Sequence, residues 1–273
     1  MIHTFKASKL FSKLQNRNWK QHAPNTVTDG HNDDQPNTDA PIRAASSNSQ
    51  VVKNSKIPPY KYYWNSLGLR GPEPDLNANR KILAIGNSFT LGMGVPVENS
   101  FIYNVAKELN ADYINLSDNF VLTDILDSAK DIIKWYNPHI IYLNETRFID
   151  NASFLAFHMV KEGAKIGRGE MFTLLEDGMS KTLNMFEDVL QYYAPNSKIV
   201  WDLNLHYVNN KKSPVGFNFA SKNLMQSFTL PVYTYTSNDI TIDLGRDGVH
   251  PGIEGHKWMT NRLVKILGEY FGQ

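Results

Sequence analysis

The strongest constraint on the fold is the alternation of short apolar runs with longer amphipathic segments from residue 80 onward. Runs of four or five apolar residues between turn residues are typical of strands buried on both faces. Short segments of this kind, each mostly apolar, occur at 81–85, 113–116, 139–143, 198–201 and 231–235. Helical spacing follows at 101–109 and 125–135, and again at the C-terminus. Because parallel strands need crossover helices, the order predicts one α/β sandwich with a mostly parallel, five-stranded sheet.

Residues 1–56 lack this pattern. The first 28 residues contain five basic side chains and no acidic one, and residues 21–56 have almost no large apolar side chains. Such a segment buries too little surface to offset its ordering entropy. We therefore expect 1–56 to be a disordered polar arm and 57–273 to be one folded domain. Residues 1–20 either form a basic amphipathic contact with a membrane surface or a partner, or fray in solvent.

Composition excludes several classes of function. The formal net charge of +1 gives no reason to expect a nucleic-acid partner. The absence of cysteine excludes disulfides, thiolate metal sites and cysteine nucleophiles. No apolar run is long enough to cross a bilayer, and lysines interrupt the N-terminal apolar residues where a secretory signal needs a continuous core. These features leave the compartment open but favour the cytoplasm, and nothing in the sequence calls for a metal or a cofactor.

A candidate nucleophile follows the first strand, in Gly86-Asn87-Ser88-Phe89-Thr90. Ligands of open parallel sheets bind at the carboxyl ends of the strands, so Ser88 would present its hydroxyl at that edge. The alternative role for Ser88 is to cap the helix that follows. A serine nucleophile needs a base, and the base needs an orienting acid.

The segment Asp247-Gly248-Val249-His250-Pro251 supplies both groups. Three residues apart on a turn, Asp247 can hold one imidazole nitrogen of His250 while the other nitrogen faces Ser88. We therefore predict a catalytic triad of Ser88, His250 and Asp247. His256 fits neither a zinc pair nor this triad, and we interpret it as structural.

Three segments resemble the SGNH, or GDSL-type, hydrolases. Asn65–Glu73 is similar to a lead-in found in one branch, and Lys81–Glu98 to the block with the nucleophile. Asp247–His256, DGVHPGIEGH, is similar to the block with the acid and base. The resemblance spans roughly residues 60–270 and implies a flavodoxin-like three-layer α/β/α sandwich with esterase activity. Asn87 departs from the family, which usually has Asp there.

The resemblance also implies an oxyanion hole. The family uses the N–H of the nucleophile, a glycine N–H after the second strand, and an asparagine side chain after the third. Here the first donor would be Ser88. No glycine follows the second strand, so the N–H of Ser117 or Phe120 would replace it. Asn144 would be the third donor, with Asn151 as the alternative, although either residue could serve only as a turn residue.

A helical insertion is expected at about 152–193, longer than a crossover requires and rich in Phe, Leu and Met. It would be either additional core or a lid over Ser88 that accommodates an apolar acyl chain.

Three functions remain open. The first is a serine ester hydrolase acting on a small-molecule or glycan ester. The second is a carbohydrate O-acyltransferase or deacetylase with the same triad, for which Trp201, Tyr207 and Trp258 are candidate sugar contacts unless they belong to the core. The third is a non-catalytic binding or assembly protein with a degraded oxyanion hole.

Overall fold

The computed structural model describes residues 25–29, 57, 60–117, 122–144, 181, 184–204, 229–235, 243, 245 and 250–272. Within them five parallel strands form one sheet in the order β4-β3-β5-β6-β7. The strands are β3 (Lys81–Gly86), β4 (Asp112–Leu116), β5 (Ile140–Asn144), β6 (Lys198–Asn204) and β7 (Val232–Tyr235). Every strand of this sheet lies where the sequence predicted it. The strand order is that of flavodoxin-like folds, so the predicted fold class is confirmed.

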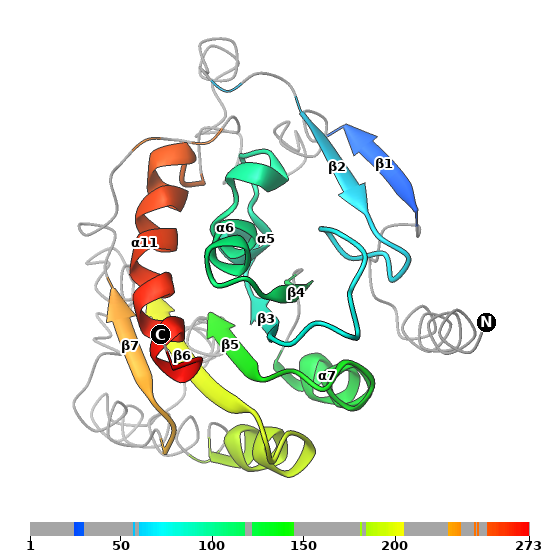
Figure 1. Cartoon of the computed structure of the whole chain (residues 1–273), viewed down its shortest axis with the longest axis vertical. Helices are drawn as coiled ribbons and strands as arrows, with labels where there is room; N and C mark the ends of the chain where they lie inside the picture. Colours follow the sequence, from blue (N-terminus) through cyan, green and yellow to red (C-terminus); the bar gives the residue numbers. More distant parts are fainter. Residues whose placement is uncertain are drawn as a thin grey trace, which may run out of the picture.

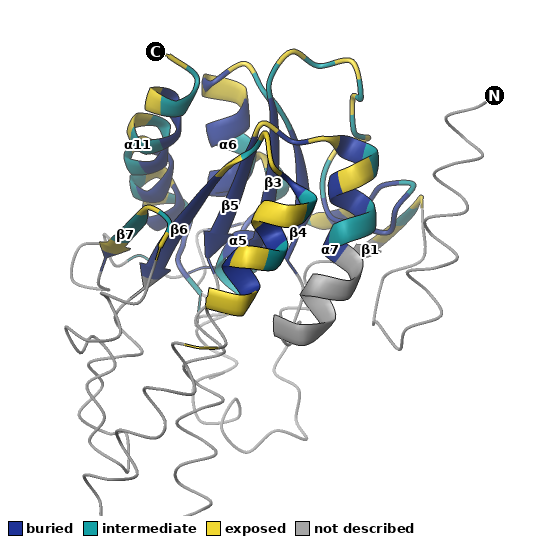
Figure 2. Ribbon diagram, turned by 90° about the horizontal axis from the view of Figure 1, so that it is seen from below, coloured by how far each residue is buried: buried dark blue, intermediate teal, exposed yellow. Residues whose placement is uncertain are grey.

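Helices cover both faces of this sheet (Figure 1). On one face lie α6 (Phe101–Glu108) and α11 (Ile253–Tyr270), and on the other lie α7 (Leu122–Tyr136) and helical residues 184–193. Figure 2 shows β3, β4 and β5 buried almost throughout, the edge strand β7 partly exposed, and the helices exposed mainly on their outer sides. The α7 helix ends two residues before Pro138, as expected where a proline restricts the residue before it.

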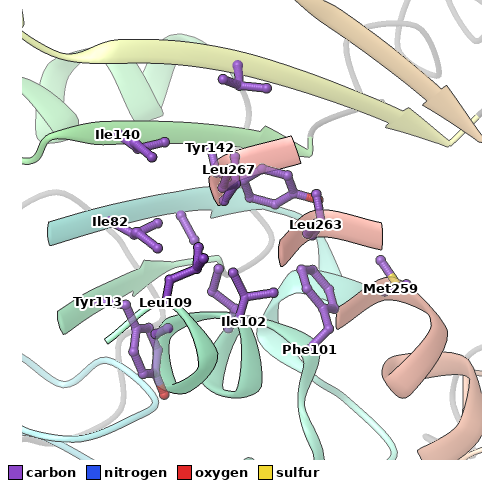
Figure 3. Packing of buried hydrophobic residues seen from close by; sticks show 14 of the residues in the cluster. Ile82, Phe101, Ile102, Leu109, Tyr113, Ile140, Tyr142, Met259, Leu263 and Leu267 are labelled. Carbon is purple, nitrogen blue, oxygen red and sulfur yellow. The ribbon is translucent and has the colours of Figure 1, made fainter. Parts of the chain in front are cut away.

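The main core lies between the sheet and the α6–α11 layer (Figure 3). Side chains of Ile82, Tyr142, Phe101 and Leu263 meet there, and each is fully buried. Truncating such a leucine to alanine typically costs about 2–5 kcal/mol of stability. On the opposite face, the ring centroid of Trp201 on β6 lies 5.6 Å from that of Phe186. The sheet edge that holds the candidate site is therefore supported from both sides.

A second, two-stranded sheet joins β1 (Thr26–Asp29) to β2 (Lys61–Trp64) in antiparallel register. β1 lies within residues 1–56, which were expected to be a disordered polar arm, and its four residues pair with β2. A strand of this length has too few residues to show a period, and its partner lies more than 30 positions away. The remainder of 1–56, apart from Asn25, lies outside the described residues, as does the expected insertion up to residue 180.

Two short helices complete the part near the site: α5 (Ser88–Leu91) and the 3-10 turn η1 (Val97–Asn99). Among the described residues, no helix combines the length and apolar character that crossing a bilayer requires.

Candidate active site

Ser88 and His250 meet at the carboxyl edge of the sheet. The Nε2 atom of His250 lies 2.8 Å from Ser88 Oγ, although the two residues are 162 positions apart in the chain. Ser88 is the first residue of α5, immediately after β3 and Asn87. The side chain of Asn87 caps α5 by accepting a hydrogen bond from the Phe89 N–H at 2.9 Å. Asn87 therefore takes the capping role, and the Ser88 hydroxyl is oriented toward the imidazole.

The position of Ser88 above the end of the sheet depends on a close approach of α5 to β5. A Cβ on Gly86 would overlap Thr90 Oγ1 and lie 2.9 Å from the carbonyl oxygen of Asn144. Only glycine allows α5 to lie this close to the end of β5. The Asn87 N–H also donates to the same Asn144 carbonyl at 3.3 Å, which ties the nucleophile turn to the neighbouring strand.

Backbone hydrogen bonds just before α11 hold His250 in place. The Gly245 N–H donates to the carbonyl of His250 at 2.8 Å, and the Gly252 N–H donates to the carbonyl of Asp243 at 2.9 Å. The Asp243 carboxylate accepts from the N–H groups of Glu254 and Gly255, at 2.9 and 2.8 Å. It thus caps α11, whose N-cap residue is a glycine without a side-chain bond. Sequence reasoning missed Asp243, because a cap supplied from so far upstream has no local signature.

An aromatic ring packs against the imidazole of His250. The Phe89 ring lies edge to face with it, at 5.8 Å between centroids and 77° between planes. Both His250 and Ser88 are half-buried, which leaves them accessible to a substrate. Asp247 lies outside the described residues, so its place as the third member of the triad stays a prediction.

The predicted oxyanion donors are placed as follows. Ser88 and Ser117 follow neighbouring strands whose ends are level, since Ile85 pairs with Leu116. Ser88 is the first residue of α5, and no described residue accepts a hydrogen bond from its N–H. The first N–H groups of a helix have no partner within it and favour an anion. Ser117 is buried directly after β4. Phe120 and the alternative Asn151 lie outside the described residues.

Asn144 lies at the end of β5, level with Gly86, and is fully buried. Its amide nitrogen donates to the hydroxyls of Tyr142 and Tyr235, at 2.9 and 3.1 Å. Both N–H bonds of the amide are therefore engaged within the protein. No described contact directs this amide at Ser88, and its oxyanion role stays a prediction.

The tyrosines belong to a buried polar network that extends to α11. The Tyr142 hydroxyl donates to Asp202 at 3.1 Å, and Arg262 Nη1 lies 2.7 and 2.8 Å from the two carboxylate oxygens of Asp202. Burial raises the pKa of Asp202 to about 6, and the Arg262 cation opposes that rise. Burial and the Asp202 charge both raise the pKa of Tyr142, which keeps its hydroxyl protonated and able to donate.

Two of the aromatic residues considered as sugar contacts are described. Trp201 is fully buried, and its indole N–H donates to the buried Glu187 carboxylate at 2.8 Å. Trp258 is partly buried against Tyr235, at 5.9 Å between ring centroids. The core interpretation is therefore correct for Trp201, while Tyr207 lies outside the described residues. No cluster of three or more metal-binding side chains occurs in the described part of the chain.

No protein-family model matches this sequence, and no curated protein matches it significantly. Several solved structures are similar in fold. A family 2 carbohydrate esterase with a carbohydrate-binding domain, from Corynascus thermopiles (Myceliophthora fergusii), is 15% identical with a TM-score of 0.49, over 75% of this chain and 70% of that chain. A family 3 carbohydrate esterase from Clostridium thermocellum is 17% identical with a TM-score of 0.48, over 71% of this chain and 98% of that chain.

A lipolytic protein of the G-D-S-L family from Desulfitobacterium hafniense is 14% identical with a TM-score of 0.44, over 69% of this chain and 99% of that chain. These similarities concern the fold alone. The chemistry of the site therefore rests on the residues of this chain alone.

Proposed function

We propose that this chain is a serine ester hydrolase with Ser88 as nucleophile, His250 as general base and acid, and Asp247 as the orienting acid. The observation that carries the proposal is the 2.8 Å contact between His250 Nε2 and Ser88 Oγ. A plain serine hydroxyl is a weak nucleophile, and an imidazole at hydrogen-bond distance is the group that activates it. Because Asn87 caps α5, helix capping does not explain why a serine stands at position 88.

The proposed reaction has two halves. Ser88 Oγ attacks the ester carbonyl carbon while its proton passes to His250 Nε2, and the alcohol leaves with that proton. Water then attacks the acyl-enzyme carbonyl, again losing a proton to His250, and Ser88 recovers its proton as the acid departs. The N–H of Ser88, with that of Ser117 or Phe120, would stabilise the oxyanion. One such donor is typically worth about 3–4 kcal/mol of transition-state stabilisation.

Covalent labelling tests the proposal directly. A fluorophosphonate should label the wild-type chain, and the Ser88→Ala variant should not be labelled. Ser197→Ala is the matched control, because its hydroxyl is bonded to the Pro138 carbonyl at the opposite edge of the sheet. His250→Gln should lower kcat for p-nitrophenyl acetate by about 10²–10⁴-fold. A folded wild-type chain that neither labels nor turns over acetyl to octanoyl esters would overturn the proposal.

The same site could transfer the acyl group to a sugar hydroxyl. The hydrolase differs from the transferase only in whether water or an alcohol attacks the acyl-enzyme. Incubation with an acetylated oligosaccharide and an unacetylated acceptor separates the two, because free acetate indicates hydrolysis and an acetylated acceptor, seen by mass spectrometry, indicates transfer. The non-catalytic alternative is favoured by one observation, the engagement of both Asn144 N–H bonds, and it predicts no labelling at all.

A further inference from the structure

A buried arginine forms hydrogen bonds with the end of α5 and the segment that follows it. Arg70 is only 2% exposed, and its guanidinium donates to three backbone carbonyls. These are the carbonyls of Leu91 at 2.9 Å, Gly92 at 2.5 Å and Val95 at 2.7 Å. The first two lie at the end of α5, and the third lies in the loop that leads to η1. The guanidinium therefore caps the C-terminal end of α5, the helix that begins with Ser88.

Backbone carbonyl dipoles and the ring of Tyr62 stabilise the positive charge of Arg70. No described carboxylate forms an ion pair with this guanidinium. Its carbon lies 3.9 Å from the centroid of the Tyr62 ring, and Tyr62 is itself held edge to face by Trp64. Carbonyls at a helix end have partial negative charge and no partner within the helix, so they suit a cation. A planar guanidinium fork presents donors on separate nitrogens in fixed directions, so it can reach carbonyls that are further apart than the single nitrogen of a lysine can.

The segment held by Arg70, residues 91–95, is hydrogen-bonded directly to the backbone of Ser88. The N–H groups of Gly92 and Met93 donate to the carbonyl of Ser88, at 3.1 and 3.0 Å. Residues 91–95 thus lie between the first residue of α5 and the Arg70 guanidinium. A displacement of this segment would move the Ser88 backbone with it.

The same segment also contacts the loop that contains His250. A Cβ on Gly245 would lie 2.8 Å from Gly94 Cα, so the two backbones are packed directly together. Gly245 in turn donates its N–H to the carbonyl of His250 at 2.8 Å. Residues 91–95 therefore contact both members of the pair, Ser88 by direct hydrogen bonds and His250 through Gly245.

We propose that Arg70 is a positioning residue that sets the separation of Ser88 and His250 by fixing residues 91–95. It has no contact with the reacting atoms, and the inference rests on the proposed hydrolase function. Without the guanidinium, three buried carbonyls lose their donor and the segment must shift to satisfy them. A misplacement of about 1 Å in a catalytic pair can cost about 10²-fold in rate.

The test compares Arg70→Lys and Arg70→Gln with Arg80→Gln as the matched control. Arg80 also donates to a helix-end carbonyl, that of Leu109 at 2.9 Å, and lies 5.3 Å from the Phe271 ring centroid. It directly precedes β3, at the opposite edge of the sheet from Ser88. For each variant, fluorophosphonate labelling gives the number of active sites and the limiting rate constant per site, and p-nitrophenyl acetate gives kcat and KM.

A positioning role predicts a loss of rate per active site. We expect the limiting rate constant and kcat of Arg70→Gln to fall by about 10–100-fold, with KM changed by less than about threefold. Arg70→Lys, which keeps the charge but not the fork, should lie between this variant and the wild type. A merely structural role would lower the number of labelled sites and leave the rate per site unchanged, which is the behaviour expected of Arg80→Gln.

If Arg70→Gln does not fold, Tyr62→Leu provides a second route, because it removes the ring beneath the guanidinium and leaves Arg70 in place. Folded Arg70 and Tyr62 variants that react at the wild-type rate per site would overturn the inference while the proposed function stands. A wild-type chain that is not labelled at all would overturn the proposed function, and this inference with it.

Discussion

Asn144 on β5 and Tyr235 on β7 are joined by a hydrogen bond of 3.1 Å, although β6 lies between their strands. The second N–H of the same amide donates to Tyr142. The amide thus connects the strand beside the nucleophile turn to the edge strand of the sheet. Its geometry is that of a structural tie, whereas the family resemblance assigned Asn144 to the oxyanion hole.

Replacing Asn144 with alanine separates these two roles. The change leaves two buried tyrosine hydroxyls without their donor, so the free energy of unfolding should fall by about 1–3 kcal/mol. Since both N–H bonds are engaged, we expect kcat per labelled site to fall by less than about tenfold. Loss of an oxyanion donor would instead lower kcat by about 10²–10³-fold. Tyr235→Phe is the control, because it removes one acceptor and leaves the amide intact.

Gly245 and Gly94 make the contact between the nucleophile segment and the His250 loop. A methyl group at Gly245 would lie 2.8 Å from Gly94 Cα, so Gly245→Ala must force the two backbones apart. We expect kcat for p-nitrophenyl acetate to fall by about tenfold or more, because His250 moves with the loop. In the control Gly272→Ala, the new methyl meets nothing within 4 Å, so the strain of alanine at a φ of +74° is the only cost, and it falls after the end of α11, away from His250. Equal kcat values for wild type and Gly245→Ala would show that this contact does not position the imidazole.

The sheet was predictable because its central strands are buried on both faces. Every residue of β3 and β5 is buried, and each strand appears in the sequence as four consecutive apolar residues, at 82–85 and 140–143. The approach of Ser88 and His250 was also predictable, because each lies in a short segment whose residue types suit one chemistry. These features are local, and a single sequence is enough to show them.

The features that the sequence did not indicate depend on contacts between distant segments. The pairing of β1 with β2, the capping of α11 by Asp243 and the bonds from Arg70 to the α5 carbonyls all join residues well apart in the chain. A tryptophan such as Trp201 is equally ambiguous, since its type suits both a sugar contact and a core position. Its bond to Glu187 and its complete burial decide for the core.

His256 should prove structural when it is replaced. Its Nδ1 atom accepts the Phe101 N–H at 3.2 Å, and its ring stacks on the Phe101 ring with centroids 5.7 Å apart. His256→Leu keeps apolar volume but removes the acceptor from the start of α6, so chemical denaturation should show a loss of about 1–3 kcal/mol. His256→Asn can still accept the Phe101 N–H at the start of α6, so we expect it to lose less stability than His256→Leu. A loss of labelling rate in folded His256→Leu, with unchanged stability, would contradict this assignment.

The buried pair of Asp202 and Arg262 should make stability depend on pH. Burial raises the folded pKa of Asp202 from 3.8 to about 6, so the folded state binds this proton more tightly than the unfolded state does. The stability that this group contributes is therefore present below about pH 4 and is lost as the pH rises through about 6. The difference between the two pKa values corresponds to roughly 2–3 kcal/mol.

Urea denaturation between about pH 4 and 8 can isolate this effect by comparison with Asp202→Asn, which has no charge to titrate. The stability of the wild type minus that of the variant should fall across this range. Arg262→Gln removes the cation that opposes the pKa rise, so its stability should fall further and over higher pH values. Breaking such a pair typically costs about 3–5 kcal/mol where the carboxylate stays ionised. Parallel pH curves for wild type and Asp202→Asn would mean that Asp202 has an ordinary pKa, and that Arg262 fully compensates for its burial.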